Sequence, residues 1–88
     1  MKIYKIIQSI NNDYDTYDSA VVYAESEEDA KGIHPDGTTD PNSWIPNPEV
    51  NYDWVDSPEY IKVEYVGENP NITKKGVILA SFNAGMIS

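Results

Sequence analysis

The sequence contains no cysteine and no arginine, and it has a single histidine. Without cysteine, the chain has no disulfide, thiolate zinc site, iron–sulfur cluster or catalytic thiol. With 15 acidic residues against 6 lysines and a net charge of -9, it also lacks the clustered basic side chains that bind phosphate. These absences argue against direct binding to nucleic acid and against binding to an anionic membrane surface.

Long apolar runs are missing as well. No window approaches the ~18 consecutive apolar residues that a membrane-spanning helix needs. Gln8 and Ser9 interrupt the first segment, which therefore lacks the apolar run of roughly 7 to 15 residues in a signal peptide. We expect a cytoplasmic protein that makes no membrane contact.

The 88 residues are enough for one modest core, so we expect a single domain over 1–88. Apolar residues make up 40% of the chain and aromatic residues 11%, a composition typical of a folded domain. Dense or alternating apolar residues predict four strands, at 2–10, 19–24, 60–66 and 77–82. The last is almost entirely apolar, which favours a central place in the sheet. The polar residues 11–18 predict a hairpin loop.

A short helix is predicted over residues 26–33. Ser26 is a suitable N-cap, and three acidic residues in the first turn favour the positive end of the helix dipole. Gly32 and Pro35 end the pattern. A helix this short needs Ala30 and Ile33 to pack on the sheet.

Five of the six prolines fall between residues 34 and 59, which excludes a long helix or a central strand there. Trp44 and Trp54 lie in the same segment, so we expect an ordered loop over the core, with the tryptophans covering it. The predicted fold class is α+β: a four-stranded antiparallel sheet in the order β-β-α-β-β, with one short helix and this long loop on one face. A partly closed barrel is the alternative.

Catalytic and metal motifs are weak. His34 follows the predicted helix, where a histidine commonly interacts with the terminal carbonyls, and no partner residue of a known catalytic motif lies nearby. Asp13, Asp15 and Asp18 resemble the start of a calcium loop, but Tyr17 occupies a ligand position and the turn glycine is absent. We therefore predict no enzyme activity, no metal site and no cofactor, with a cation-binding or small-ligand module as an alternative and a hydrolase built on His34 as a further one.

Charge distribution is more informative. Residues 11–68 hold all 15 acidic residues and only two lysines, a local charge of -13, while the other four lysines lie at the two ends. Aromatic residues are interleaved with the acids, a mixture suited to a partner surface rich in lysine and arginine. The predicted partner-binding residues are Asp13, Tyr14, Asp15, Tyr17, Asp18, Asp53, Trp54, Asp56 and Glu59. The plainer interpretation is an acidic domain whose charge serves solubility alone.

Several segments carry a resemblance. The runs 13–22, 24–30 and 33–35, then 54–58, 62–65 and 76–85, resemble a family of small acidic accessory proteins encoded by bacteriophages and prophages. The family has no assigned activity or site residues. The resemblance implies a phage accessory protein, a class in which small acidic proteins sometimes block host nucleases by imitating DNA. With the charge distribution and the lack of catalytic motifs, it leads us to expect a non-enzymatic protein that binds a host protein with a basic surface, as a DNA mimic or anti-defence factor. The oligomeric state stays open at this point.

Overall fold

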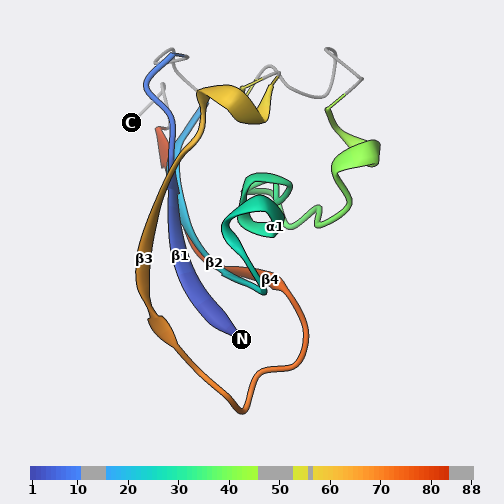
Figure 1. Cartoon of the computed structure of the whole chain (residues 1–88). Coiled ribbons are helices and arrows are strands. Elements are labelled where there is room, and N and C mark those ends of the chain that lie inside the picture. The colour runs from blue at the N-terminus through green and yellow to red at the C-terminus, as the bar shows by residue number, and fades with distance from the viewer. Residues whose placement is uncertain (11–15, 46–52, 56, 84–88) are drawn as a thin grey trace.

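The computed structural model describes residues 1–10, 16–45, 53–55 and 57–83. Its strands are β1 (Lys2–Ile7), β2 (Thr16–Ala24), β3 (Lys62–Glu68) and β4 (Gly76–Asn83), and its helix is α1 (Glu27–Lys31). Two 3₁₀ turns, η1 (Pro41–Ser43) and η2 (Pro58–Tyr60), lie in the long connection between α1 and β3. The predicted order β-β-α-β-β is confirmed (Figure 1).

All strand pairs are antiparallel, and the sheet order is β3-β1-β2-β4. The β1–β2 hairpin is therefore central, and β3 and β4 are opposite edges of an open sheet rather than neighbours in a barrel. The β3–β4 connection passes the start of β1 (Figure 1), where the Met1 ammonium donates hydrogen bonds to the carbonyl oxygens of Asn69 and Ile72, at 2.7 and 2.9 Å.

The central place predicted for the last strand is wrong, because β4 is an edge strand. An apolar sequence alone does not distinguish a central strand from an edge strand, because an edge strand can also carry apolar side chains that stay exposed. Val77 and Ala80 pack against the core, whereas Leu79 is 67% exposed.

The helix forms as predicted, but it ends at Lys31. The Ser26 hydroxyl accepts a hydrogen bond from the Asp29 amide at 3.2 Å, which satisfies one of the free amides of the first turn. Gly32 follows as the C-cap, and a side chain there would meet the Pro41 ring at 3.3 Å. The close approach of Pro41 therefore favours glycine at position 32.

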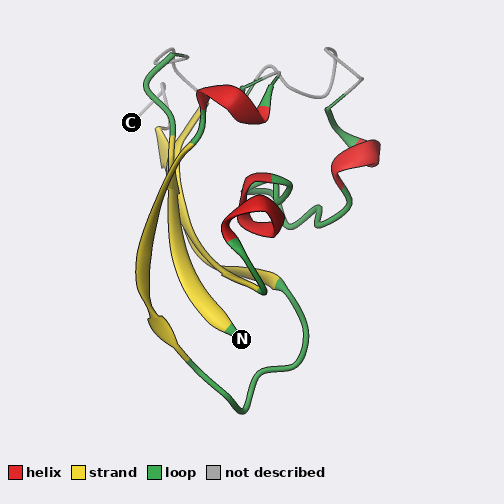
Figure 2. Ribbon diagram, in the orientation of Figure 1, coloured by secondary structure: helices red, strands yellow, loops and turns green. Residues whose placement is uncertain are grey.

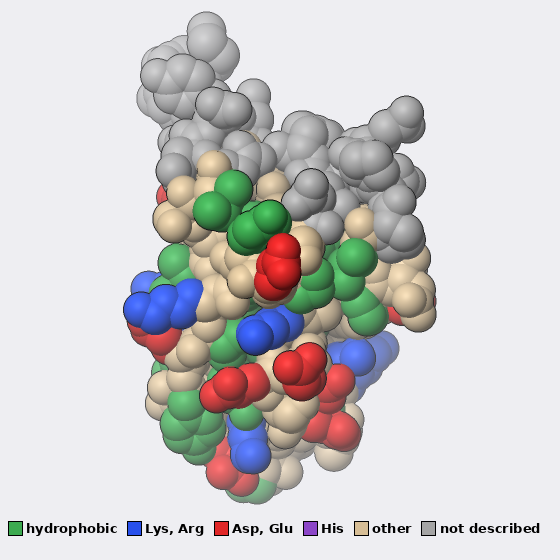
Figure 3. Space-filling view, turned by 45° about the horizontal axis from the view of Figure 1, so that its top comes forward, with side chains coloured by type: hydrophobic (Ala, Val, Ile, Leu, Met, Phe, Trp, Pro, Cys, Tyr) green, Lys and Arg blue, Asp and Glu red, His purple; other side chains and the backbone are tan. Residues whose placement is uncertain are grey.

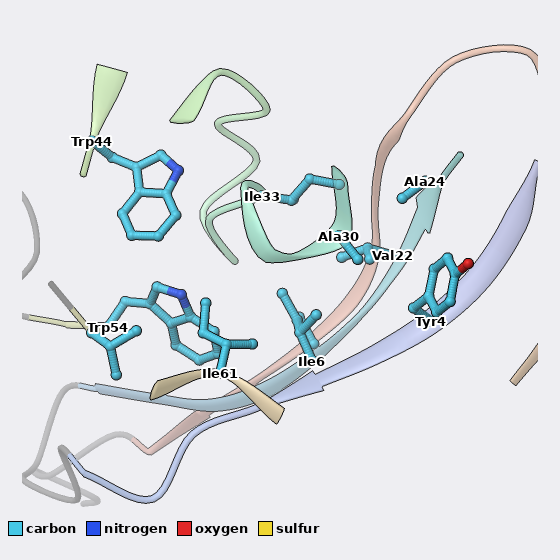
Figure 4. Close-up of a cluster of buried hydrophobic side chains, with 11 residues drawn as sticks. Tyr4, Ile6, Val22, Ala24, Ala30, Ile33, Trp44, Trp54 and Ile61 are labelled. Carbon is cyan, nitrogen blue, oxygen red and sulfur yellow. The ribbon is translucent and has the colours of Figure 1, made fainter. Parts of the chain in front are cut away.

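The helix, the 3₁₀ turns and the described loop between α1 and η1 lie on one face of the sheet (Figure 2). Period-two alternation points Tyr4, Ile6, Ala20 and Val22 toward this layer, and each is buried. Trp44 and Trp54, at 0% and 1% exposure, fill the space between the layers (Figure 4). The tryptophans cover the core, as expected from the sequence.

The other face of the sheet carries no described helix or loop. Ile3, Ile7, Val21 and Tyr23 alternate with the core residues along the two central strands, and all four are half-buried. We call the two sides of the sheet the covered face and the bare face.

No helix in the described part of the chain has the length and apolar character needed to cross a bilayer.

Candidate functional site

Of the nine predicted partner-binding residues, five lie in the described part of the chain; Asp13, Tyr14, Asp15 and Asp56 lie outside it. Asp18 on β2 and Glu59 in η2 are exposed. The other three described residues of the set do not share an open surface with Asp18 and Glu59. Trp54 is in the core, and Tyr17 and Asp53 are half-buried beside His34.

His34 is fully buried in a tight loop that follows α1. Its amide donates to the Thr38 carbonyl at 2.8 Å, and the Gly37 amide donates to the His34 carbonyl at 2.9 Å. Gly37 has φ of 107°, a backbone conformation that favours glycine. These bonds close a loop of five residues and fix the position of the imidazole.

Two carboxylates flank the imidazole ring. Nδ1 accepts a hydrogen bond from the Asp36 amide at 3.0 Å, so the proton of the neutral ring lies on Nε2. Nε2 is 3.1 Å from Oδ1 of Asp53, although the angle is too bent for a formed hydrogen bond, and both atoms are buried. We therefore describe the Asp53 contact as electrostatic. Oδ1 of Asp36 lies 3.2 Å from Nδ1 on the other side.

Asp36 shows the effect of this arrangement on a carboxylate. Partial burial raises its pKa, but hydrogen bonds from Thr38, together with the attraction that His34 exerts in its protonated form, outweigh the burial, so the pKa lies below its ordinary value. The Thr38 amide donates to Oδ1 of Asp36 at 2.9 Å. The charged form of Asp36 is thus part of the folded loop.

Three aromatic rings enclose the imidazole. The ring centroids of Trp44, Tyr17 and Trp54 lie 5.5, 6.0 and 6.4 Å from that of His34, in edge-on or tilted arrangements. The Trp44 indole N–H donates to the Gly32 carbonyl at 2.8 Å. Because the imidazole has no exposed surface, a substrate would have to displace one of these rings to reach it.

The same centre joins distant parts of the chain. The Tyr17 amide on β2 donates to the Asp53 carbonyl at 2.8 Å, so the strand, the loop around His34 and the segment at Asp53 meet at one point. Sequence reasoning did not foresee the contact between His34 and Asp53. They are 19 positions apart in an irregular stretch, where no periodicity predicts proximity.

Among the described residues, the densest run of exposed acidic residues lies elsewhere, on the segment 25–40. This acidic segment contains six acidic residues and one lysine; five of the six are exposed and Asp29 is half-buried. Its acidic residues are Glu25, Glu27, Glu28, Asp29, Asp36 and Asp40. The sequence showed the acids of the helix start, which we interpreted as favourable to the helix dipole rather than as a binding surface.

Lysines do not neutralise the acidic segment. Among the described residues, the one lysine–carboxylate ion pair joins Lys62 and Glu64 on β3, at 3.8 Å and in solvent. Acidic and lysine side chains are interspersed on the view in Figure 3, so the surface is acidic without being uniform. No cluster of three or more potential metal ligands occurs in the part of the chain that the structure describes.

Comparisons with family models, curated proteins and solved structures yield no match to this chain.

Proposed function

We propose that the protein is a non-enzymatic binding module whose acidic segment, residues 25–40, docks on a basic surface of another protein. The observation that carries the proposal is the excess of six acidic residues over one lysine in that segment, with five of the acids exposed. Such a surface repels phosphate, attracts basic proteins and raises the rate of encounter.

The order of the segment supports this proposal. The Ser26 cap fixes the first turn of α1, which presents Glu27 and Glu28 to solvent. Further along, the Asp40 carboxylate accepts hydrogen bonds from the Asn42 amide and the Ser43 hydroxyl, at 3.0 and 3.3 Å. Charges held on an ordered backbone lose less conformational entropy on binding than charges on a flexible tail.

The environment of His34 supports a role without catalysis. A general base has to reach the proton it removes, and the only histidine of the chain is enclosed by aromatic rings. Its contacts with Asp36 and Asp53 are those of a buried polar cross-link that fastens the loops to the sheet.

The resemblance to phage accessory proteins suggests the kind of partner. We propose a host protein whose basic surface normally meets nucleic acid, so that the acidic segment competes as a DNA mimic and inhibits a host defence or nucleic-acid-binding protein. This part rests on the resemblance and on the sign of the charge.

A pull-down from host lysate with a salt titration tests the proposal. Capture should fall as salt rises from about 50 to about 500 mM, because the attraction is between exposed charges. The double variant Glu27→Gln/Glu28→Gln should weaken capture on the order of fivefold. Its matched control is Glu64→Gln/Glu68→Gln, which removes the same charge from exposed positions on β3 and should leave most of the capture.

Thermal melts of both double variants control for folding, since the first-turn glutamates also stabilise α1 by about 0.3 to 1 kcal/mol each. The proposal fails if capture is insensitive to salt, or if the two double variants weaken it equally.

A further inference from the structure

The two edges of the sheet differ in their protection against pairing with another strand. Edge strand β3 carries Lys62, Glu64 and Glu68 among its seven residues, and a β-bulge lies where it passes Ile3 and Tyr4. Charged side chains and bulges are devices that keep an edge strand from pairing with another chain. The β3 edge is thus protected.

The pairing of β4 is irregular as well, because its register with β2 shifts between Tyr17 and Ser19 and between Val21 and Val22, but the β4 edge has none of these charges. Its eight residues include no acid and no lysine, in a chain in which 24% of residues are charged. Ile78, Leu79 and Phe82 are 44%, 67% and 46% exposed. Among the described residues β4 pairs with β2 alone, so one row of its backbone amides and carbonyls faces outward.

The bare face next to β4 is also hollowed. Leu79 stands beside Val21, and Ser81 beside Ser19, in the pairing of β4 with β2. Together with Lys5 these residues line a shallow hollow of about 440 Å³. An uncovered edge therefore continues into an uncovered, concave part of the sheet.

We propose that the β4 edge pairs with the β4 edge of a second copy of this chain. The two strands run antiparallel across a two-fold axis near Ala80, and the four-stranded sheets become one sheet of eight strands. In this arrangement Leu79 of each copy lies opposite Ser81 of the other, and both side chains point to the bare face.

Charge complementarity between the ends of β4 favours a second copy in this orientation. Lys74 and Lys75 immediately precede β4. The other end of β4 pairs with the start of β2, next to exposed Asp18. The two-fold axis therefore brings the basic end of each copy toward the acidic end of its partner, which a parallel arrangement does not do.

The uncharged edge also suits the net charge of the chain. Two molecules of charge -9 repel one another, and β4 is a strand on which they meet without placing like charges opposite each other. The repulsion keeps the affinity low and is reduced by salt. Dimerisation should therefore strengthen with rising salt, whereas docking of the acidic segment on a basic partner weakens.

Sedimentation velocity of the full chain tests this pairing. The experiment is run at about 500 mM salt. As the protein concentration rises from about 10 to about 500 μM, a range that covers weak interfaces, the average molecular mass should rise from that of one chain to that of two. Leu79→Lys should raise the dissociation constant at least tenfold. The matched control Val66→Lys adds the same charge at an exposed position of the β3 edge and should dimerise like the unmodified chain.

A chain that stays monomeric over this range overturns the proposal, and so does dimerisation that both lysine variants weaken equally. A third outcome also overturns the proposal. If the chain stays monomeric and Leu79→Lys, but not Val66→Lys, weakens its capture of a basic partner, then the β4 edge binds an extended segment of that partner. Circular dichroism of both variants confirms that each is folded. The outcome is independent of the acidic segment, because neither variant changes residues 25–40.

Discussion

The two faces of the sheet have different tasks. On the covered face, Trp44, Trp54 and His34 are almost fully buried and hold the helix and loops in place. On the bare face, Val21 and Leu79 are side by side with nothing from the described chain above them. The difference teaches that the most conspicuous side chains of the sequence serve folding, and that the candidate interaction surfaces are its acidic helix segment and its uncharged edge strand.

Truncating the covered face should have the largest effect. Trp44→Ala removes a fully buried ring and its hydrogen bond to Gly32, so we expect a loss of about 3 to 5 kcal/mol in the free energy of unfolding. Leu79→Ala on the bare face should change it by about 0.5 kcal/mol or less. Urea denaturation at low protein concentration measures both. Equal losses would remove the distinction between the faces.

The next effect concerns the polar centre of the covered face. His34→Ala leaves a cavity and deprives the Asp36 amide of its acceptor, and should cost about 2 to 4 kcal/mol. Asp53→Asn keeps an oxygen facing the protonated Nε2 of His34. It should therefore lower the free energy of unfolding by about 1 kcal/mol or less. Denaturation curves compare the two variants. A larger loss for Asp53→Asn than for His34→Ala would contradict the assigned contacts.

How much of this fold the sequence predicts depends on the range of the interaction. The Ser26 cap and the first strand depend on local sequence, and both are confirmed, although the strand predicted at 2–10 ends at Ile7. The strand predicted at 19–24 begins earlier, at Thr16, because pairing with β4 extends it into polar residues. The strand predicted at 60–66 runs from Lys62 to Glu68, since the η2 turn occupies its expected start.

Long-range features were not predictable in the same way. The edge position of β4 depends on where two crossovers place the outer strands, and its composition did not reveal it. The meeting of His34 with Asp53 and Tyr17 depends on the course of the proline-rich loop. The strand predicted at 60–66 does not bury all of its apolar residues. Tyr65 is 58% exposed at the edge, although its ring centroid lies 5.8 Å from that of Tyr4.

The smallest effect is a dependence on pH at the rim of the covered face. The pKa of Asp36 lies below its ordinary value of 3.8, so its charged form stabilises the fold above that pH, and the contribution disappears as the pH falls through the lowered pKa. Asp36→Asn should therefore be less stable than the unmodified chain near pH 7, by under about 1 kcal/mol. The gap should close as the pH falls through the lowered pKa of Asp36. Chemical denaturation at several pH values checks it, and a gap that widens in acid would reverse the assigned sign.

The central claim is that the acidic segment on the covered side binds basic partners while the bare face does not. The most direct measurement is a two-dimensional ¹⁵N–¹H NMR titration with a lysine- and arginine-rich peptide at about 50 mM salt, repeated at about 500 mM. We expect shift changes concentrated in residues 25–40 that disappear at high salt. Changes concentrated on β1 and β4, or changes that persist at high salt, would contradict it.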